Sequence, residues 1–278
     1  MHDPDVAGHD HWPRHARQWA RVGPPLRPVA DDVAVVEALA ATCPRGSGRG
    51  PRVAVLGVTP ELVAARWPAG TTLLAIERAA AVIAALYPRA GAPAGAVAVQ
   101  GDWLALPVGA AGLDLIAGDG ATSNLVFPDG YRALAGEVAR ALAPGGRLCL
   151  RLFTAPPVRE SLADVGAALA AGSIGSFHAF KWRVAMAIQP AERNVAVAAI
   201  RDAVVGLVPD RAALAAHTGW ARDVIDGIDV YRGSTLRYSF PAQAEVEAVV
   251  AERLALIAVR TPRYELGERC PTLIWAAR

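Results

Sequence analysis

Residues 52–62 read RVAVLGVTPEL, a short apolar run that ends at a glycine and is followed by threonine and proline. Runs with so little polar alternation are typical of strands buried on both faces of a sheet. Gly57 permits a tight turn, Thr59 suits a helix N-cap, and Pro60 suits the first helical position. The stretch predicts a buried strand that turns into a helix, whose free N–H groups favour an anionic ligand group. An ordinary turn without a ligand explains these residues equally well.

Four further apolar runs resemble the first one, and helical segments separate most of them. The runs are 71–77 (TTLLAIE), 96–100 (AVAVQ), 113–117 (LDLIA) and 147–153 (RLCLRLF). The helical segments are 61–67, 79–87 and 129–142, and the last one ends at a Pro-Gly-Gly stop. Strands that alternate with helices predict βαβ units and a parallel sheet.

The remainder of the chain adds helices before and after these units. Predicted helices lie at 12–22, 31–41, 158–171, 176–188, 194–208, 210–217 and 241–253. Two closing strands, 254–261 and 272–278, are joined by a turn-rich segment. We expect an N-terminal helical cap (1–50), a ligand-binding α/β domain (51–155 and 241–278), and a mostly helical insertion (156–240) that covers the substrate.

Composition limits the classes of protein to which the chain can belong. Of 278 residues, 53% are hydrophobic and 19% are charged, which is enough apolar material for a full core. The net charge of +2 gives no general field that attracts nucleic acid. No uncharged apolar run reaches the roughly 18 residues of a transmembrane helix, so no membrane partner is expected.

Cysteine and histidine usage points to a reducing compartment and to no metal. Three cysteines without a CxxC pair, and a polar N-terminus without an apolar signal segment, predict a cytoplasmic protein. No zinc-type spacing of histidine and cysteine occurs. Four histidines, including His11 and His15, lie among the first 15 residues, and a disordered polar end explains them better than a weak metal site.

Ligands of open α/β sheets bind beyond the carboxyl ends of the strands, so the residues there are candidates for a site. Glu77 ends the second strand 20 residues after Gly57, where an acid accepts from both hydroxyls of a ribose. Asp102 and Trp103 follow the third strand, where a carboxylate and a ring suit an adenine. Asp119 follows the fourth strand between two glycines, which leaves room for a ligand.

Each of these residues also has an ordinary explanation. Glu77 suits a solvent-facing acid or a partner of Arg78, Trp103 suits the core, and Asp119 suits a plain turn. Their conjunction is stronger than any one of them, because all lie at strand ends in the order that one nucleoside site requires.

These motifs resemble those of the class I methyltransferases that use S-adenosylmethionine (SAM). The matching stretches are 53–62 (VAVLGVTPEL), 73–77 (LLAIE), 100–103 (QGDW), 113–120 (LDLIAGDG) and 143–148 (APGGRL). The family's first motif usually carries several glycines, and this chain departs from it at Thr59 and Pro60. The resemblance implies methyl transfer from SAM, which leaves S-adenosylhomocysteine (SAH). It also implies a Rossmann-like α/β fold with a mostly parallel seven-stranded sheet of order 3-2-1-4-5-7-6, N-terminal helices, and a helical insertion after strand 5.

The resemblance further implies which residues bind the cofactor. They are Gly57, Val58 and Thr59 at the methionine part, Glu77 with its neighbour Arg78 at the ribose, Asp102 and Trp103 at the adenine, and Asp119 and Gly120 between cofactor and substrate. Trp19 and Arg27 would contact the methionine part if the N-terminal segment folds over it. Packing of an N-terminal helix on the sheet explains Trp19 and Arg27 slightly better.

The expected substrate cover contains the stretch 177–183 (FHAFKWR), which mixes aromatic, basic and titratable side chains. His178 is a candidate base, because imidazole titrates near neutral pH, and Lys181 is a candidate substrate contact. Ordinary packing explains this stretch at least as well. The other substrate candidates are Tyr131 and Arg151, and Asp119 is a second catalytic candidate, which would orient the acceptor. A sulfonium methyl is already electrophilic, so alignment of donor and acceptor matters most and no strong catalytic signature is expected.

The sequence thus favours a methyltransferase that acts on an unidentified small molecule. A non-catalytic SAM-binding or SAH-binding regulator stays open, because the first motif is altered. A nicotinamide-dependent oxidoreductase predicts GxGxxG after the first strand, and a nucleic-acid methyltransferase predicts a basic stripe, neither of which the sequence contains. Helical covers in this fold often take part in dimers, so a homodimer is among the expectations.

Overall fold

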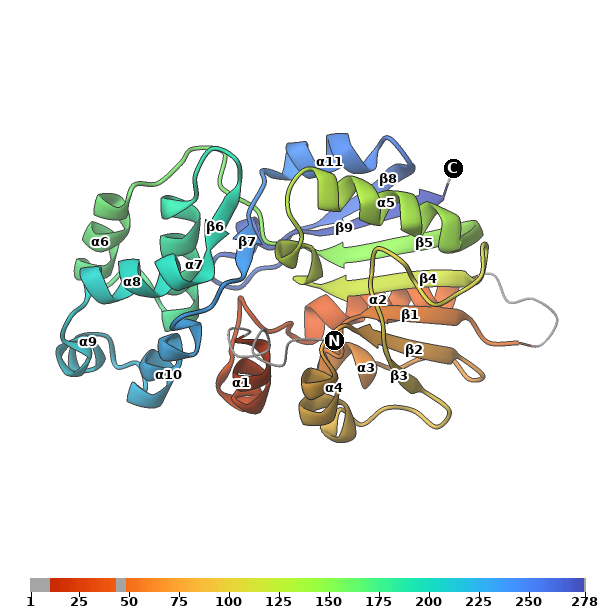
Figure 1. Cartoon of the computed structure of the whole chain (residues 1–278), viewed down its shortest axis with the longest axis horizontal. Helices are drawn as coiled ribbons and strands as arrows, with labels where there is room; N and C mark the ends of the chain where they lie inside the picture. The colour runs from red at the N-terminus through yellow and green to blue at the C-terminus, as the bar shows by residue number, and fades with distance from the viewer. Residues whose placement is uncertain (1–10, 44–48, 278) are drawn as a thin grey trace, which may run out of the picture.

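A computed structural model describes residues 11–43 and 49–277. Figure 1 shows a central sheet between two layers of helices, with a mostly helical region beyond the carboxyl ends of the parallel strands. In the described part of the chain, no helix combines the length and the apolar character that crossing a membrane requires.

Seven strands form the central sheet in the order β3-β2-β1-β4-β5-β9-β8. They are β1 (Arg52–Leu56), β2 (Thr72–Glu77), β3 (Val97–Gln100), β4 (Leu113–Asp119), β5 (Leu142–Arg151), β8 (Leu254–Arg260) and β9 (Thr272–Ala277). The first five are parallel, and β9 runs antiparallel between β5 and β8. Since β8 and β9 are the sixth and seventh strands of this sheet along the chain, the expected order 3-2-1-4-5-7-6 is confirmed.

Strand β1 shows why the apolar runs form buried strands. Successive side chains of a strand point to opposite faces of the sheet. Val53 and Val55 pack into the core on one face, and Ala54 and Leu56 pack into the core on the other. A strand buried on both faces has no polar side to show in its sequence, which is why alternation is absent.

Helices cover both faces of the sheet (Figure 1). One face carries α2 (Ala30–Thr42), α3 (Pro60–Val63) and α4 (Ala80–Leu86), and the other carries α5 (Asp129–Ala141) and α11 (Gln243–Val250). At the start of α2, the Asp32 carboxylate accepts a hydrogen bond of 3.0 Å from the backbone N–H of Val29. This bond satisfies a donor that the first turn of a helix otherwise leaves unpaired.

The helical region packs around a core of its own. Its elements are α6 (Leu162–Ala170), α7 (Phe177–Ile188), α8 (Val197–Leu207), α9 (Arg211–Thr218), α10 (Arg222–Asp226), and a small sheet of β6 (Asn194–Ala196) with β7 (Arg237–Ser239). Helix α7 is its centre, and Phe180, Val184 and Ala185 are fully buried there. The N-terminal helix α1 (Trp12–Arg17) and the short turn η2 (Trp19–Arg21) contribute partly buried tryptophans to this same core.

The structure corrects several expected element boundaries. The helix expected at 12–22 is divided at Gln18, and the one expected at 61–67 is a single turn. Residues 194–196 form β6 instead of the first turn of a helix, because they pair with β7 more than 40 residues later. Such a long-range partner leaves no local pattern. The division into cap, binding domain and insertion stays a prediction.

Truncation of the sheet core tests this packing. Leu115 of β4 is 0% exposed, so Leu115→Ala removes buried methyl groups and leaves a cavity. We expect the free energy of unfolding in urea to fall by about 2–5 kcal/mol. Val158→Ala is the control, because Val158 is 82% exposed and its truncation should change stability by no more than about 0.5 kcal/mol. Equal losses in the two variants would contradict the described core.

Candidate functional site

A cavity lies where the carboxyl ends of the strands meet the helical region and α1. The sheet side of its wall consists of Gly57, Val58, Thr59, Glu77, Arg78, Asp102, Trp103, Asp119 and Gly120. Trp19 also lines it, so every residue implied as a cofactor contact except Arg27 is brought to one wall. The rule that ligands bind at strand carboxyl ends accounts for this placement.

The turn after β1 leaves open space beside Glu77 and Trp103. Gly57 has φ = +96°, a conformation that side-chain-bearing residues rarely adopt. A Cβ placed on Gly57 would lie 3.9 Å from Oε2 of Glu77 and 3.9 Å from Cζ2 of Trp103. Thr59 stands at the N-cap of α3 as predicted, but its side chain makes no cap hydrogen bond.

Backbone contacts fix the residues that follow β2 and β3. Glu77 Oε1 accepts a hydrogen bond of 2.9 Å from Ala79 N, and Trp103 Nε1 donates one of 2.7 Å to the carbonyl of Ile76. Asp102 is exposed, and its Oδ1 accepts from Leu104 N at 2.9 Å. Hydrogen bonds to backbone groups therefore hold the Glu77 and Asp102 carboxylates and the Trp103 indole ring in place at the cavity wall.

Asp119, at the end of β4, is paired with Arg151 at the end of β5. Both side chains are nearly inaccessible, with 4% and 3% exposure, and Arg151 Nε donates to Asp119 Oδ1. Arg151 Nη1 also donates to the Pro25 carbonyl and to the Tyr264 hydroxyl, each at 2.7 Å. Burial raises the pKa of the Asp119 carboxyl, and the neighbouring Arg151 guanidinium opposes this shift. Asp119 lines the cavity, whereas Arg151, expected at the substrate wall, stands behind it.

The N-terminal segment is attached to the sheet through Glu61 on α3. Glu61 Oε1 accepts from Arg27 Nε and, at 3.3 Å, from Trp19 Nε1. The Arg27 guanidinium lies 5.9 Å from the centre of the Trp19 ring. Arg27 is thus committed to Glu61, while Trp19 forms part of the cavity wall. Glu61 is not among the site residues expected from the sequence, although it directly follows the Thr-Pro of the first motif.

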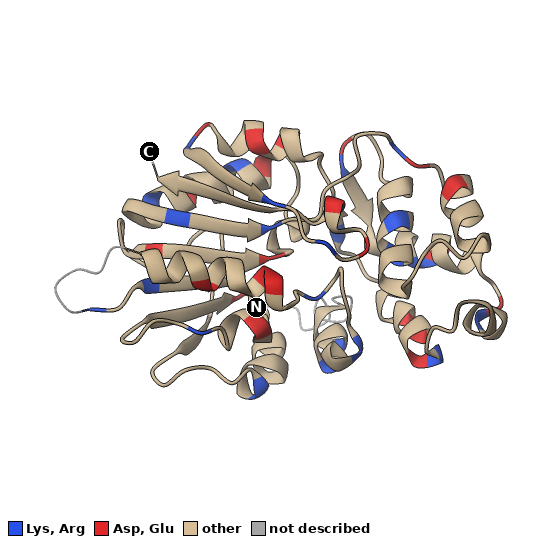
Figure 2. Cartoon of the chain, turned by 180° about the vertical axis from the view of Figure 1, so that it is seen from behind, with Lys and Arg blue, Asp and Glu red and all other residues tan. Residues whose placement is uncertain are grey.

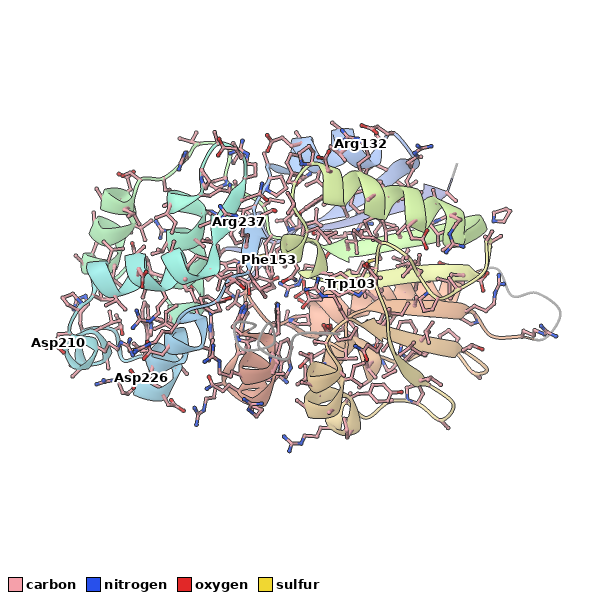
Figure 3. All side chains as sticks on the ribbon, viewed as in Figure 1. Trp103, Arg132, Phe153, Asp210, Asp226 and Arg237 are labelled. Carbon is pink, nitrogen blue, oxygen red and sulfur yellow. The ribbon has the colours of Figure 1, made fainter. Side chains whose placement is uncertain are left out.

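The opposite wall of the cavity is aromatic, and we call it the aromatic chamber. It consists of Trp12, His15, Phe153, Trp182, Tyr231 and Tyr238, which come from α1, the segment after β5, α7, the turn η5 (Gly227–Tyr231) and β7. Figure 3 shows Phe153 at the junction between the sheet and the helical region. Of these residues, the sequence pointed to Trp182 within the 177–183 stretch and to Trp12 in the N-terminal segment expected to fold over the cofactor, and it placed His15 in a disordered end. The others lie far apart in the chain, and no motif joins them.

Two histidines support the chamber, and the expectation of a disordered end is wrong for both. His11 is fully buried, with Nε2 2.7 Å from the Tyr238 hydroxyl and Nδ1 3.1 Å from Ser234 Oγ. Burial lowers the pKa of His11 to about 3 and that of His15 well below its usual value, with the charge of Lys181 adding to both effects. Both rings are therefore neutral at pH 7. Residues 1–10, with the other two N-terminal histidines, lie outside the described residues.

The remaining substrate candidates lie outside the cavity wall. Tyr131 is a buried residue of α5, and the centre of its ring lies 5.2 Å from that of Phe127. His178 is held by a contact of 3.0 Å between its Nε2 and the Arg21 carbonyl, and burial lowers its pKa to about 4. Lys181 is 3% exposed, and its Nζ lies 4.7 Å from the centre of the Tyr231 ring. Of these, only Lys181 contacts the chamber.

In the described residues, neither the distribution of charge nor the possible metal ligands indicates a second site. Figure 2 shows basic and acidic residues interspersed over both the sheet and the helical region. Within residues 11–43 and 49–277, no group of three or more histidine, cysteine or acidic side chains is placed to hold a metal ion. The cysteines Cys43, Cys149 and Cys270 are buried and free.

Comparison with known proteins gives similarity of structure without similarity of sequence. No family model and no curated protein matches the sequence. A SAM-dependent methyltransferase from Methanosarcina mazei has a TM-score of 0.50 at 14% identity, over 82% of this chain and 92% of its own. A chain in the complex of the Haloferax volcanii Trm112 methyltransferase activator with a methyltransferase has a TM-score of 0.53 at 11% identity, over 96% of this chain and 98% of its own.

A further similar structure carries a different name. A Rhodobacter sphaeroides protein named as a zinc-dependent alcohol dehydrogenase has a TM-score of 0.60 at 13% identity, over 97% of this chain and 99% of its own. At these identities the likeness shows the fold alone. The chain has the Rossmann-like fold of SAM-dependent methyltransferases, with the same mostly parallel seven-stranded sheet.

The buried pair of Asp119 and Arg151 is open to a direct test. Arg151→Met removes one partner and leaves a buried carboxylate without compensation, so we expect a loss of about 3–5 kcal/mol in the free energy of unfolding in urea. Adding Asp119→Asn to the same variant removes the orphaned charge and should restore part of the loss. A single variant as stable as the unaltered protein would contradict the pairing.

The buried His11 makes stability depend on pH. Its pKa is about 3 in the folded chain against 6.5 ordinarily, so below pH 6.5 the unfolded chain binds a proton that the folded chain does not. The contribution is present above pH 6.5 and is lost as pH falls, by roughly 2 kcal/mol between pH 7 and pH 5. In urea unfolding at pH 7 and pH 5, the free energy of unfolding of His11→Gln should fall less on acidification than that of the unaltered protein, by roughly 2 kcal/mol. An unchanged pH dependence in the variant would contradict the buried neutral ring.

Proposed function

We propose that the chain transfers a methyl group from SAM to a small-molecule acceptor in this cavity. The observation that carries the proposal is the convergence of Glu77, Asp102 and Trp103 on one wall beside the open turn at Gly57. Two acceptor groups and a flat ring are what the ribose hydroxyls, amine and base of an adenosine require. The fold, shared with SAM-dependent methyltransferases, supports the same function.

The residues present fit SAM. Glu77 would accept hydrogen bonds from the ribose hydroxyls, Asp102 would accept one from the adenine amine, and Trp103 would cover the base. Gly57 has no side chain where one would approach both Glu77 and Trp103 within 4 Å, so a nucleoside can lie close to the backbone there. SAM, when bound, supplies a methyl group made electrophilic by the sulfonium.

The other residues of the cavity would position the acceptor and exclude water. In the sheet order β3-β2-β1-β4-β5, Asp119 and Gly120 at the carboxyl end of β4 lie between the residues of the nucleoside wall and Phe153 of the aromatic chamber, so an acceptor in the chamber would face the reacting end of the cofactor. Trp12 of α1 donates to Asn124 Oδ1 at 3.1 Å and holds the N-terminal helix over the cavity. Enclosure of this kind aligns two reactants and removes solvent, which is the main requirement of methyl transfer.

The walls of the chamber favour a small acceptor over a polymer. They come from α1, α7 and β7, and in the described part of the chain basic positions are interspersed with acidic ones (Figure 2). A dehydrogenase fits less well, because the turn after β1 carries one glycine where a dinucleotide pyrophosphate needs several. The free cysteines support a cytoplasmic location. No contact of the described chain bears on the expected homodimer.

Calorimetric titration with SAH and with NADH tests the proposal. We expect micromolar binding of SAH and none of NADH, and Glu77→Ala should weaken SAH about tenfold or more, because the ribose hydroxyls lose a charged acceptor. Asp202→Ala is the control, since the Asp202 side chain is 71% exposed and lies outside the cavity wall. A folded protein that does not bind SAH would overturn the proposal. SAH binding without methylation of any acceptor would favour a regulator.

A further inference from the structure

Lys181 stands out because it is the only lysine of the chain. The sequence has 28 basic residues, and the other 27 are arginines. An arginine stays charged in any protein, whereas a lysine amine loses its proton when it is buried. The one position that carries lysine is therefore a position where a basic side chain can become neutral.

Lys181 occupies a buried site without a counter-ion. Its Nζ lies 4.7 Å from the centre of the Tyr231 ring and 5.6 Å from that of Trp182, and both rings line the aromatic chamber. Among the described residues, no hydrogen bond or ion pair to Nζ is formed. Burial of an amine costs several kcal/mol unless a partner compensates, so the site favours either loss of the proton or an anionic partner.

Histidine rings and tyrosine hydroxyls, not carboxylates, lie near Lys181 in the described part of the chain. His11 at the N-cap of α1, His15 on α1 and His178 on α7 all lie within the electrostatic range of Lys181. The phenols of Tyr231 and Tyr238 face the same chamber from η5 and β7. Burial lowers the pKa of Lys181 to about 7, so its amine exchanges a proton near neutral pH. The histidine rings stay neutral there and have much weaker basicity.

Acidic side chains are confined to the other half of the cavity. Glu77, Asp102 and Asp119 are the acids of the described wall, and all three follow strands of the sheet. Nothing negative in the described chamber wall competes for Lys181. Lys181 lies outside the cavity wall, and its uncompensated Nζ packs against the Tyr231 and Trp182 rings of the chamber, an arrangement that suits a flat molecule that becomes an anion.

Building on the proposed methyl transfer, we propose that the acceptor is a small phenol, whose ring packs among Trp182, Tyr231 and Tyr238 and whose hydroxyl proton passes to Lys181. The O–H bond breaks, its electron pair stays on the oxygen, and the proton adds to the neutral Nζ. The product is a phenolate beside an ammonium, and the oxygen is then a stronger nucleophile. Lys181 is a base in this scheme, and the rings are positioning groups.

Other acceptor classes fit the chamber less well. A protonated amine would be repelled by Lys181, and an aliphatic alcohol is far too weak an acid for this base. A carboxylic acid is already ionised at neutral pH and needs no base. A phenol has an ordinary pKa of about 10, and the ammonium formed beside its oxygen stabilises the phenolate in a buried ion pair.

The single lysine allows its state to be observed directly. In the full-length protein labelled with ¹³C,¹⁵N-lysine, NMR shows one lysine side chain, so no assignment is needed. We expect its signal to titrate near pH 7 and to move when 4-nitrophenol is added. A signal that titrates above pH 9, as in an exposed lysine, or that ignores 4-nitrophenol, would overturn the proposal.

Absorbance of 4-nitrophenol supplies the second readout, since its phenolate absorbs at a longer wavelength than the phenol. We expect the protein to bind it as the phenolate. Lys181→Met, which keeps the length of the side chain, should weaken binding about tenfold or more and abolish the spectral shift. Arg237→Met is the matched control, because exposed Arg237 precedes Tyr238 on β7 and lies outside the cavity (Figure 3). It should bind 4-nitrophenol as the unaltered protein does.

Two further titrations separate this proposal from the function on which it rests. 4-Nitroanisole has the same ring without an acidic hydroxyl, so its affinity should not depend on Lys181. SAH should bind Lys181→Met and the unaltered protein equally, which also shows that the variant is folded. Suppose that SAH binds normally. If 4-nitrophenol then binds independently of Lys181, or does not bind at all, the phenol proposal alone is overturned. Absence of SAH binding in the unaltered protein overturns the methyltransferase.

Discussion

The arrangement of the cavity depends on the buried ion pair between Asp119 and Arg151. These side chains extend from the carboxyl ends of adjacent parallel strands, and each alone would be costly to bury. Arg151 also binds the carbonyl of Pro25 and the hydroxyl of Tyr264, so one guanidinium holds the N-terminal segment and the β8–β9 connection against the sheet. The wall that Asp119 presents to the cavity is fixed as a result.

The cavity beside this ion pair has two halves that differ in chemistry. On the sheet side, acidic residues stand at the carboxyl ends of the parallel strands. These positions tolerate acidic side chains because they face the cavity, and backbone hydrogen bonds hold the strands together. On the far side, α1, α7 and β7 bring rings together, and the charge behind them is that of Lys181. A cofactor with hydroxyls and an amine fits the first half, and a flat acceptor fits the second. Asp119 and Gly120 stand between them, where the two reactants would meet.

Local patterns predicted the sheet well and the chamber poorly. The buried strands are visible because residues such as Val53 and Ala54 pack on opposite faces and leave no polar position. The residues at the strand ends follow from topology, which brings Glu77 and Asp102 to one edge. The contact of His11 with Tyr238 spans 227 positions, and the β6–β7 pairing spans more than 40. Contacts of this separation leave no periodicity, which is why the sequence predicted a disordered N-terminus although His11 and His15 support the aromatic chamber.

The most direct test of the account is a crystal structure of the protein with SAH. We expect SAH in the cavity, with both ribose hydroxyls within hydrogen-bond distance of Glu77, the adenine beside Asp102 and Trp103, and the sulfur directed toward Asp119 and the aromatic chamber. Clear electron density for SAH at another place, or crystals grown with saturating SAH whose cavity holds only water, would contradict the account.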